Sequence, residues 1–253
     1  MRATLTVALI SFNEENNIAR TLESVKGIAD EIIVVDSYSS DKTREIAESH
    51  GARVLTHAWA GFTEQKNYLF SLCTKDYILN IDCDEVVTPE LAAEIQVMLE
   101  NPGFEGYRIP MFNRYMGKLL KHAWYADKFR LVKRSANPIW RGGEIHEKLS
   151  VDGKIGQLKQ ALIHYSYANV EDHFSRTVKY ARLGAMKKFK SGKKFHLYSL
   201  VFNPPYAFFK SYIMQRGVLD GLPGFVVACS SWLAAFLKYL FLYELERQAK
   251  AEK

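Results

Sequence analysis

Three carboxylates stand within four residues at Asp82, Asp84 and Glu85, directly after the apolar run 77–81. Such crowding is repulsive unless a cation is close by. Side chains two residues apart point to the same side of an extended segment, so Asp82 and Asp84 could both reach one hard divalent cation. Mg²⁺ or Mn²⁺ suits these oxygen ligands best. The alternative interpretation is that the acidic turn only caps a helix that begins at Thr88.

The elements that must position this turn alternate between strand and helix patterns. Apolar runs predict strands over 5–10, 32–35, 52–56 and 77–81. Helical spacing or capping residues predict helices over 15–26, 41–50, 62–73 and from Pro89 to 101–103. This alternation predicts an α/β fold with a mainly parallel sheet, whose ligands bind at the carboxyl ends of the strands. The polar segments 11–14, 36–37 and 82–84 all stand at such ends.

Several classes of protein are disfavoured by what the sequence lacks. No G-x-G-x-x-G follows the first strand and no G-x-x-x-x-G-K-[ST] occurs, which disfavours a Rossmann dinucleotide domain and a P-loop nucleotidase. Cys73, Cys83 and Cys229 form no C-x-x-C pair, so we expect no structural zinc site and a reducing compartment. The amino terminus reads as a strand without an export signal, and a cytosolic location follows as an expectation.

At these positions the chain resembles the inverting nucleotide-sugar glycosyltransferases of family 2, which have the GT-A fold. The resemblance rests on the segments 7–15, 33–37 with 40–43, and 82–84, in the family's order. It implies that Asp36 contacts the uracil or ribose of a UDP-sugar and that Asp82 and Asp84 hold a metal on the diphosphate. Many members carry two consecutive Asp where this chain has Asp36-Ser37. The residues implied at the nucleotide-sugar are Phe12, Asn13, Glu14, Asp36, Lys66 and Asp82.

Lys66 lies in the segment 65–67, which resembles a family segment that supplies a further nucleotide contact. Its ammonium could place a point charge near the base or the phosphates. The alternative is an ordinary solvated lysine. His164 ends an apolar run and could complete the metal or diphosphate site, or be a hydrogen-bonded core residue.

The segment 140–147 is the most informative part of the middle of the chain, because it combines two glycines with carboxylates and an imidazole. It resembles the His-Glu element of the family's lipopolysaccharide-core branch. An inverting transferase needs a carboxylate that takes the proton of the acceptor hydroxyl. We predict Glu147 as this base, with Glu144 and then Asp127 as alternatives, unless Glu147 only pairs with a nearby Lys or Arg. Diphosphate or acceptor contacts are predicted for Arg130, Arg141 and His146.

Charge divides the chain into an acidic first part and a basic second part. Residues 1–100 carry a net charge of −9 and residues 101–253 carry +15. The segment 173–219 holds ten Lys or Arg and no acidic residue, and seventeen uncharged residues follow at 221–237. We expect a helix over 221–243 that lies in, or dips into, an anionic membrane surface, or else packs on the protein's own core or in a dimer. No nucleic-acid-binding signature accompanies the basic residues, so no nucleic acid partner is expected.

The tail over 212–243 resembles that of bacterial lipopolysaccharide-core β-1,4-glucosyltransferases, which extends the resemblance to nearly the whole chain. The resemblance implies UDP-glucose as donor, a heptose or related sugar of the lipid A core as acceptor, and a peripheral location on the cytoplasmic face of the bacterial inner membrane. The predicted domains are a GT-A domain over 1–168, with a nucleotide half (1–100) and an acceptor half (101–168), and a helical membrane-associating region over 169–253. The oligomeric state stays open.

Three other functions compete with glycosyl transfer. A nucleotidyltransferase also uses acidic metal ligands on an α/β sheet, but it carries a glycine- and lysine-rich loop that 11–14 lacks. A glycoside hydrolase could use paired carboxylates without a metal pair or a nucleotide rim. A non-catalytic membrane-surface adaptor on a degenerate transferase fold would not need Asp36, Asp82 and Asp84.

Overall fold

A computed structural model describes residues 1–142 and 147–251. The chain forms two compact units. The sheet unit contains Met1–Phe112 and Ala126–His164, and the helical unit contains Asn113–Tyr125 and Tyr165–Lys253. The boundary between the units lies after His164, and residues 113–125 belong to the helical unit. The sequence predicted a domain boundary after residue 168. The predicted nucleotide and acceptor halves stay predictions.

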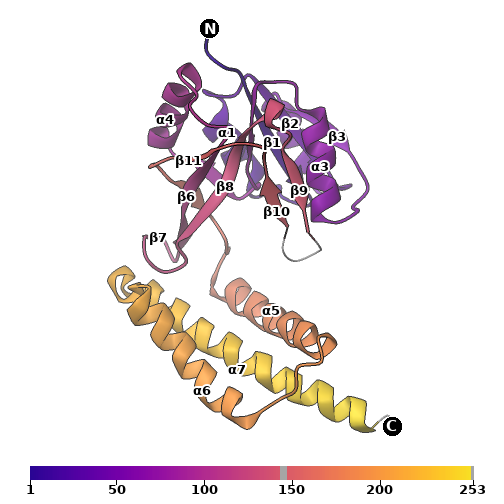
Figure 1. The fold of residues 1–253 in the computed structure, drawn as a ribbon, viewed down its shortest axis with the longest axis vertical. Coiled ribbons are helices and arrows are strands. Elements are labelled where there is room, and N and C mark those ends of the chain that lie inside the picture. Colours follow the sequence, from indigo (N-terminus) through magenta and orange to yellow (C-terminus); the bar gives the residue numbers. More distant parts are fainter. Residues whose placement is uncertain (143–146, 252–253) are drawn as a thin grey trace. The chain divides into compact units, whose positions relative to one another are not determined.

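Strands and helices alternate through the first hundred residues, as the sequence predicts (Figure 1). The strands of this part are β1 (Leu5–Ser11), β2 (Glu31–Asp36), β3 (Arg53–Thr56), β4 (Tyr77–Asn80) and β5 (Glu85–Val87). The helices are α1 (Ile18–Val25), α2 (Thr43–Ser49), α3 (Phe62–Leu72) and α4 (Pro89–Glu100). Helix α4 begins as predicted, because the Thr88 hydroxyl accepts from the Leu91 N–H at 3.1 Å and Pro89 takes the first position.

The middle of the chain adds short strands and one 3₁₀ turn. They are β6 (Gly106–Tyr115), β7 (Lys118–Leu120), β8 (Ala126–Lys133), η1 (Arg134–Ala136), β9 (Ile139–Arg141), β10 (Lys148–Ser150), β11 (Ile155–Gln157) and β12 (Leu162–His164). Strands β9 and β10 pair with each other in a separate two-stranded sheet. The main sheet has the order β3-β2-β1-β4-β8-β6-β12-β5.

The α/β fold expected from the sequence is confirmed, and its sheet is mixed. Strands β1 to β4 pair in parallel, whereas β4–β8, β8–β6 and β12–β5 are antiparallel. The parallel prediction therefore holds for the first four strands, and it is wrong for the pairs β4–β8, β8–β6 and β12–β5. Among the later strands, β11 pairs with β6 in parallel. The parallel strands bring Ser11 beside Asp36 in register, at one edge of the sheet.

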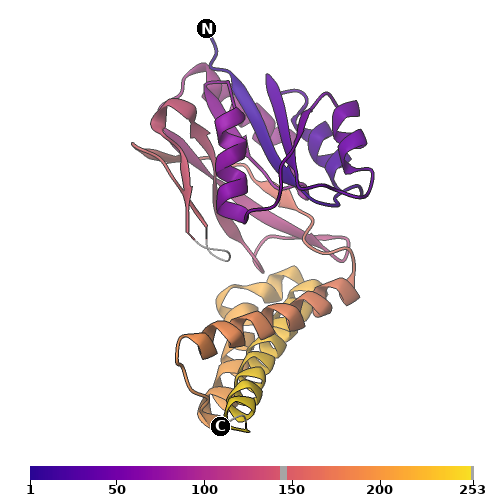
Figure 2. The same cartoon turned by 90° about the vertical axis from the view of Figure 1, so that its right-hand side faces the viewer.

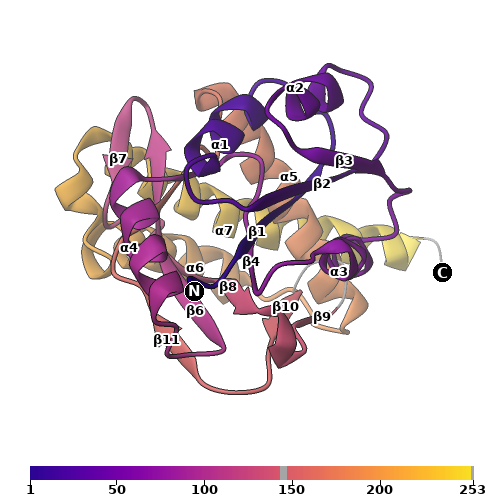
Figure 3. The ribbon, with the colours of Figure 1, turned by 90° about the horizontal axis from the view of Figure 1, so that it is seen from above.

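Alternate side chains of the central strands bury two different core clusters. Leu5, Val7 and Leu9 of β1 join the cluster beneath α1 and α4, whereas Ala8 joins the cluster beneath α3. Because successive strand residues point to opposite faces, one apolar strand fills both layers. In Figure 3, α1 and α2 lie on the opposite side of the sheet from α3. Helices on both faces leave the strand ends as the accessible edge.

The helical unit contains three long helices, which lie side by side in Figure 2. Its elements are α5 (Val170–Lys190), α6 (Leu197–Phe209), η2 (Lys210–Met214), η3 (Gly217–Asp220) and α7 (Leu222–Ala251). Helix α7 packs against both α5 and α6. The closest approach lies where η3 meets the start of α7, since a Cβ on Gly224 would stand 1.9 Å from the Gly217 carbonyl oxygen. Only glycine fits at that crossing.

Helix α7 is continuous over 30 residues and contains Pro223 and Gly224 near its start. Both lie in its first turn, where a backbone N–H has no partner within the helix, so the N–H that Pro lacks costs no hydrogen bond. Among the described residues, α7 is the one helix long and apolar enough to cross a membrane, by length and composition. In its most apolar stretch, 28% of the residues are buried within the protein. The alternative that 221–243 packs on the protein itself therefore holds for part of the α7 surface, which contacts α5 and α6.

Candidate functional site

The loops that follow β1 and β2 are tied together by side-chain hydrogen bonds. The Asn13 N–H donates to the Ser39 hydroxyl at 2.8 Å, and the Asn13 side-chain oxygen Oδ1 accepts from the Ser40 N–H at 2.9 Å. The Glu14 N–H donates to the Thr43 hydroxyl at 2.7 Å. Asn13 has a φ of 55°, a left-handed conformation that Asn adopts more readily than most non-glycine residues. The two predicted segments thus form one rim.

Asp36 lies at the end of β2 with no exposed surface. One carboxylate oxygen accepts from the hydroxyls of Ser11 (3.0 Å) and Ser39 (2.5 Å), and the other accepts from the Ser39 N–H at 2.7 Å. Here the carboxylate holds the rim in shape. Its predicted contact with a base or ribose would require the Ser39 loop to move.

Two aromatic side chains stand exposed on this rim. Phe12 is 58% exposed and Tyr38 is 62% exposed, and each follows a strand end by one or two residues. Tyr38 has a φ of 61°. Phe12 is among the predicted nucleotide contacts, whereas Tyr38 was missed. The signal for Tyr38 was an aromatic residue at a strand's carboxyl end, where an apolar side chain would otherwise be buried.

The acidic segment forms a turn, which corrects the expectation of an extended segment. The Cys83 carbonyl accepts from the Thr21 hydroxyl at 2.6 Å, and the Cys83 thiol lies 3.3 Å from the Ile10 carbonyl oxygen. These contacts fix the turn to α1 and β1. Asp82 and Asp84 therefore have different partners.

Arg130 of β8 stands between two carboxylates and is 5% exposed. Its guanidinium donates to Asp82 at 2.6 Å and also to Glu85, which is 1% exposed. Desolvation favours the neutral form of Asp82, but the charges of Arg130 and Lys66 outweigh it and hold the pKa of Asp82 below its usual range. Burial is the larger effect at Glu85 and raises its pKa. Arg130 thus acts as the internal counter-charge of the acidic turn, not as a free diphosphate ligand.

Asp84 and His164 are brought together by the pairing of β5 with β12, in which Glu85 faces His164. The imidazole Nε2 lies 3.1 Å from an Asp84 carboxylate oxygen, and both side chains are 24% exposed. Desolvation opposes protonation of His164, but the hydrogen bond and the charge of Asp84 outweigh it and raise the His164 pKa. The imidazole therefore lies beside the acidic turn, and its completion of a metal or diphosphate site stays a prediction.

The donors at this turn fit a divalent cation that is held jointly with a ligand's phosphates. Among residues 1–142 and 147–251, no group of three or more His, Cys, Asp or Glu is arranged to hold a metal alone. Mg²⁺ usually takes one or two protein carboxylates and completes its shell with phosphates and water. Asp84 offers one partly exposed carboxylate and Asp82 a second, 40% exposed, at the same turn. The predicted metal ligands are therefore chemically suitable, although each has a protein partner here.

Two of the predicted site residues form an ion pair. The ammonium of Lys66 lies 3.1 Å from a carboxylate oxygen of Glu147, with side chains 5% and 21% exposed. The same ammonium lies 4.3 Å from the centre of the Trp140 ring, a cation–π contact. Lys66 is thus a buried, paired lysine and not a solvated one. Its charge also acts on Asp82, so the ion pair belongs to the same electrostatic cluster as the acidic turn.

The neighbours of Lys66 attach α3 to its surroundings. The Gln65 amide donates to the Ser37 hydroxyl at 3.0 Å, and the Asn67 side chain both donates to and accepts from the backbone of Trp140, at 3.0 and 2.9 Å. Lys66 is therefore held between two residues with fixed positions.

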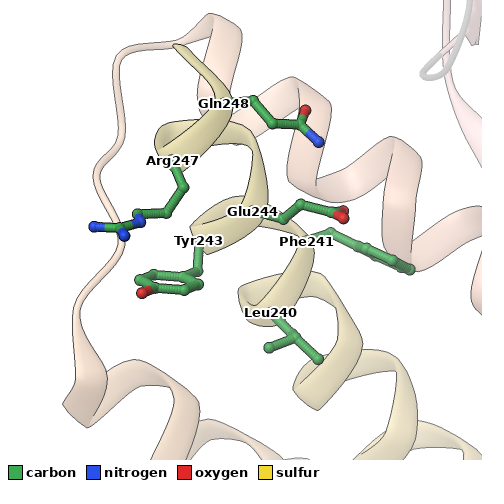
Figure 4. Close-up of a pocket in the computed structure, with 6 residues that line it drawn as sticks. All are labelled: Leu240, Phe241, Tyr243, Glu244, Arg247 and Gln248. Atoms are coloured by element: carbon green, nitrogen blue, oxygen red, sulfur yellow. The ribbon is translucent and has the colours of Figure 1, made fainter. Parts of the chain in front are cut away.

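The remaining predicted residues are distributed around this cluster. Asp127 on β8 is exposed and accepts from Gln157 at 3.1 Å, and Arg141 is exposed at the end of β9. Glu144 and His146 lie outside the described residues. One further depression, lined by Leu240, Phe241, Tyr243, Glu244, Arg247 and Gln248, belongs wholly to α7 (Figure 4). It holds none of the predicted site residues.

Comparison with known families gives a match over most of the sheet unit. The family model for glycosyl transferase family 2 matches residues 6–147. An uncharacterized glycosyltransferase of Rickettsia conorii is 33% identical over 97% of this chain and 90% of its own length. The lipopolysaccharide core biosynthesis glycosyltransferase LpsC of Rhizobium meliloti is 27% identical over 95% of this chain and 92% of its own length.

Comparison with solved structures finds glucosyl-3-phosphoglycerate synthase of Mycobacterium tuberculosis. The structure of that enzyme with Mn²⁺, UDP and phosphoglyceric acid superposes with a TM-score of 0.48 and 20% identity, over 65% of this chain and 71% of that one.

Proposed function

The chain belongs to glycosyl transferase family 2 and is a glycosyltransferase, and on this premise we propose that it transfers glucose from UDP-glucose to a sugar of the lipopolysaccharide inner core. The observation that carries the proposal is the electrostatic cluster of Asp82, Asp84, Lys66 and Glu147 at the carboxyl edge of the sheet. The cluster combines groups for a diphosphate with a carboxylate for an acceptor hydroxyl.

The donor would lie along the rim after β1 and β2. The exposed rings of Phe12 and Tyr38 offer apolar faces for a nucleobase, and Asn13 and Glu14 line the same loop. Asp36 holds this rim in shape through its hydrogen bond from the Ser39 N–H. UDP-glucose is the donor that the lipopolysaccharide-core resemblance implies.

Asp84 and Asp82, with His164 beside Asp84, are the residues that would hold Mg²⁺ or Mn²⁺. A bound divalent cation would offset the negative charge that develops on the departing diphosphate. The protein supplies the fixed turn that keeps the two carboxylates at the sheet edge.

Glu147 is the proposed general base. It is partly exposed, and the ion pair with Lys66 holds its carboxylate in one position. It would take the proton of the acceptor hydroxyl while that oxygen attacks the anomeric carbon opposite the UDP, so that an α-linked donor gives a β-linked product. Asp127 is the other described carboxylate that was predicted for this role. Its hydrogen-bond partner is the neutral Gln157, so no ion pair holds it in position as Lys66 holds Glu147.

The acceptor assignment is supported by the relative LpsC, whose name places that protein in lipopolysaccharide core biosynthesis. We propose a heptose of the lipid A core, with the exposed Arg141 near an acceptor phosphate. Such an acceptor lies in a membrane leaflet, so the enzyme would act as a peripheral protein on the cytoplasmic face of the inner membrane.

The test is release of UDP by the purified protein from a panel of UDP-sugars, with truncated lipopolysaccharide acceptors and with or without Mg²⁺ or Mn²⁺. We expect metal-dependent release with one donor. Glu147→Gln should lower turnover by about 10²- to 10⁴-fold and keep UDP affinity. Asp152→Asn, an exposed change in the same unit, is the control and should leave turnover unchanged.

Two outcomes would contradict parts of the proposal. Full transfer by Asp84→Asn in chelated buffer would refute the metal role. Absence of both UDP release and UDP binding would favour a non-catalytic membrane-surface adaptor instead.

A further inference from the structure

Helix α6 exposes its large apolar side chains instead of burying them. Six of them are between 52% and 70% exposed: Leu197, Tyr198, Val201, Phe202, Tyr206 and Phe209. Their spacing places them on one face of the helix. Ile213 and Met214 of η2 continue the exposed surface. We call these eight residues the α6 face.

The opposite side of α6 carries the residues that are buried. Ser199, Pro204 and Ser211 are the buried members of α6 and η2, and Asn203 beside them donates to the Ser199 carbonyl at 2.8 Å. Aromatic contact adds to this packing where Phe208 meets Phe225 of α7, with ring centres 5.9 Å apart. A helix in water buries its large apolar side chains, whereas helices in lipid contact one another through small residues and direct the large ones outward.

Cationic side chains stand at both ends of the α6 face. Lys193 and Lys194 precede α6, and Lys210 and Arg216 follow it, all of them exposed. The segment 173–219 itself holds no acidic residue, and Glu246 of α7 accepts from the Phe195 N–H beside Lys194. An apolar surface with exposed cations before and after it complements an anionic bilayer, in which lysines reach the headgroups while apolar side chains enter the acyl boundary.

We propose that the α6 face inserts into the headgroup and upper acyl layer of an anionic membrane and is the principal membrane contact of the protein. This differs from the sequence prediction, which gave that role to 221–243. Helix α7 packs against α5 and α6, so it serves as the support on which the α6 face is displayed. The inference rests on the proposed function only for why a membrane is the relevant surface, since a lipid-anchored acceptor requires access to one.

The experiment is co-sedimentation of the full chain with vesicles of phosphatidylcholine alone or with about one third phosphatidylglycerol. We expect binding to the anionic vesicles that weakens with salt. The double variant Phe202→Ser with Phe209→Ser should reduce binding by about tenfold or more, because both rings lose their burial in lipid. Val97→Ser, which removes an equally exposed apolar side chain from α4 of the sheet unit, is the matched control and should bind as the unmodified protein does.

Charge is tested separately with Lys193→Glu combined with Lys194→Glu. We expect this variant to lose the preference for anionic vesicles. Tryptophan fluorescence of all variants without lipid checks that they remain folded. The inference is overturned if the unmodified chain does not bind anionic vesicles, or if the double Phe variant binds as well as Val97→Ser.

A second copy of the chain is the competing occupant of this face. Size-exclusion chromatography without lipid would reveal it as a dimer that the double Phe variant converts to a monomer, and that result would overturn the inference. Transfer to a water-soluble truncated acceptor is measured in parallel. Vesicle binding without transfer would count against the proposed function and support the inference. Transfer without vesicle binding would support the proposed function and count against the inference.

Discussion

The sheet unit and the helical unit distribute apolar side chains in opposite ways. The sheet unit buries large residues such as Leu79, Ile95 and Leu131 completely. In the described part of 165–251, most buried apolar residues are alanines, among them Ala181, Ala185 and Ala228. Of the 32 exposed large apolar side chains in the described residues, 21 lie between residues 170 and 243, less than a third of the chain. One unit is thus stabilised by removing large apolar surface from water, and the other by close helix packing.

This contrast separates two tasks within one chain. Burial of large side chains and of a charge network makes the sheet edge rigid, which positions the groups of the candidate site. Exposure of large side chains costs stability in water and is useful only where another phase or partner covers them. Substitutions in the two units test this contrast.

The largest effect is expected from Arg130→Met in the sheet unit. The change leaves Glu85, which is 1% exposed, and Asp82 without their counter-charge. Removing one partner of a buried ion pair costs about 3–5 kcal/mol in the free energy of unfolding, measurable by urea denaturation. Combining Arg130→Met with Glu85→Leu removes the uncompensated charge and should restore part of the stability. A loss below about 1 kcal/mol in the single variant would contradict the role of Arg130 in this network.

A smaller effect is expected from Asp220→Ala in the helical unit. The Asp220 carboxylate accepts from the backbone N–H groups of Lys121, His122 and Ala123, at 3.1, 3.1 and 2.7 Å. Leaving these donors without an acceptor should cost about 1–3 kcal/mol. Amide hydrogen exchange should become faster at these three residues and stay unchanged in β1. Equal exchange in Asp220→Ala and the unmodified chain would mean that other groups hold this turn.

The smallest effect is expected from Phe202→Ser in the absence of lipid. Because this ring is 70% exposed, the free energy of unfolding should change by less than about 0.5 kcal/mol. Leu79→Ala provides the contrast from the sheet unit, where deletion of a fully buried side chain costs about 2–5 kcal/mol. If Phe202→Ser were as destabilising as Leu79→Ala, the helical unit would be stabilised in the same way as the sheet unit.

Sequence patterns predicted the first hundred residues well, because the apolar stripe of each helix there packs on the sheet and the apolar central strands are buried on both faces. The predicted strand 32–35 and helix 62–73 agree with β2 and α3 within one or two residues. The direction of the later strands was not predicted, since antiparallel pairing depends on distant partners such as β4 and β8. The segment 221–237 is apolar all round, so its pattern could not specify which face contacts protein.

The sequence predicted which residues belong to the candidate site better than it predicted which of them pair with one another. Asp84 and His164, 80 residues apart, were assigned to one site, and they lie in contact. Lys66 and Glu147 were predicted in separate roles, with pairing of Glu147 to a nearby Lys or Arg as the alternative. They form an ion pair. The sequence could not name the partner, because the contact depends on how α3 lies against β9. Tyr38 was missed, although an aromatic residue just after a predicted strand was a signal for it; its left-handed backbone is not visible in the sequence pattern.

Helix α3 is attached to the chain on both sides of the segment 141–146. Asn67 fastens Trp140, just before this segment, and Lys66 fastens Glu147, just after it, so both stems are held by adjacent residues of one helical turn. The number and type of residues between the stems can therefore vary in evolution without moving Glu147 away from the acidic turn. Insertion or deletion at this point would thus leave the Lys66–Glu147 ion pair and the attachment of Trp140 in place.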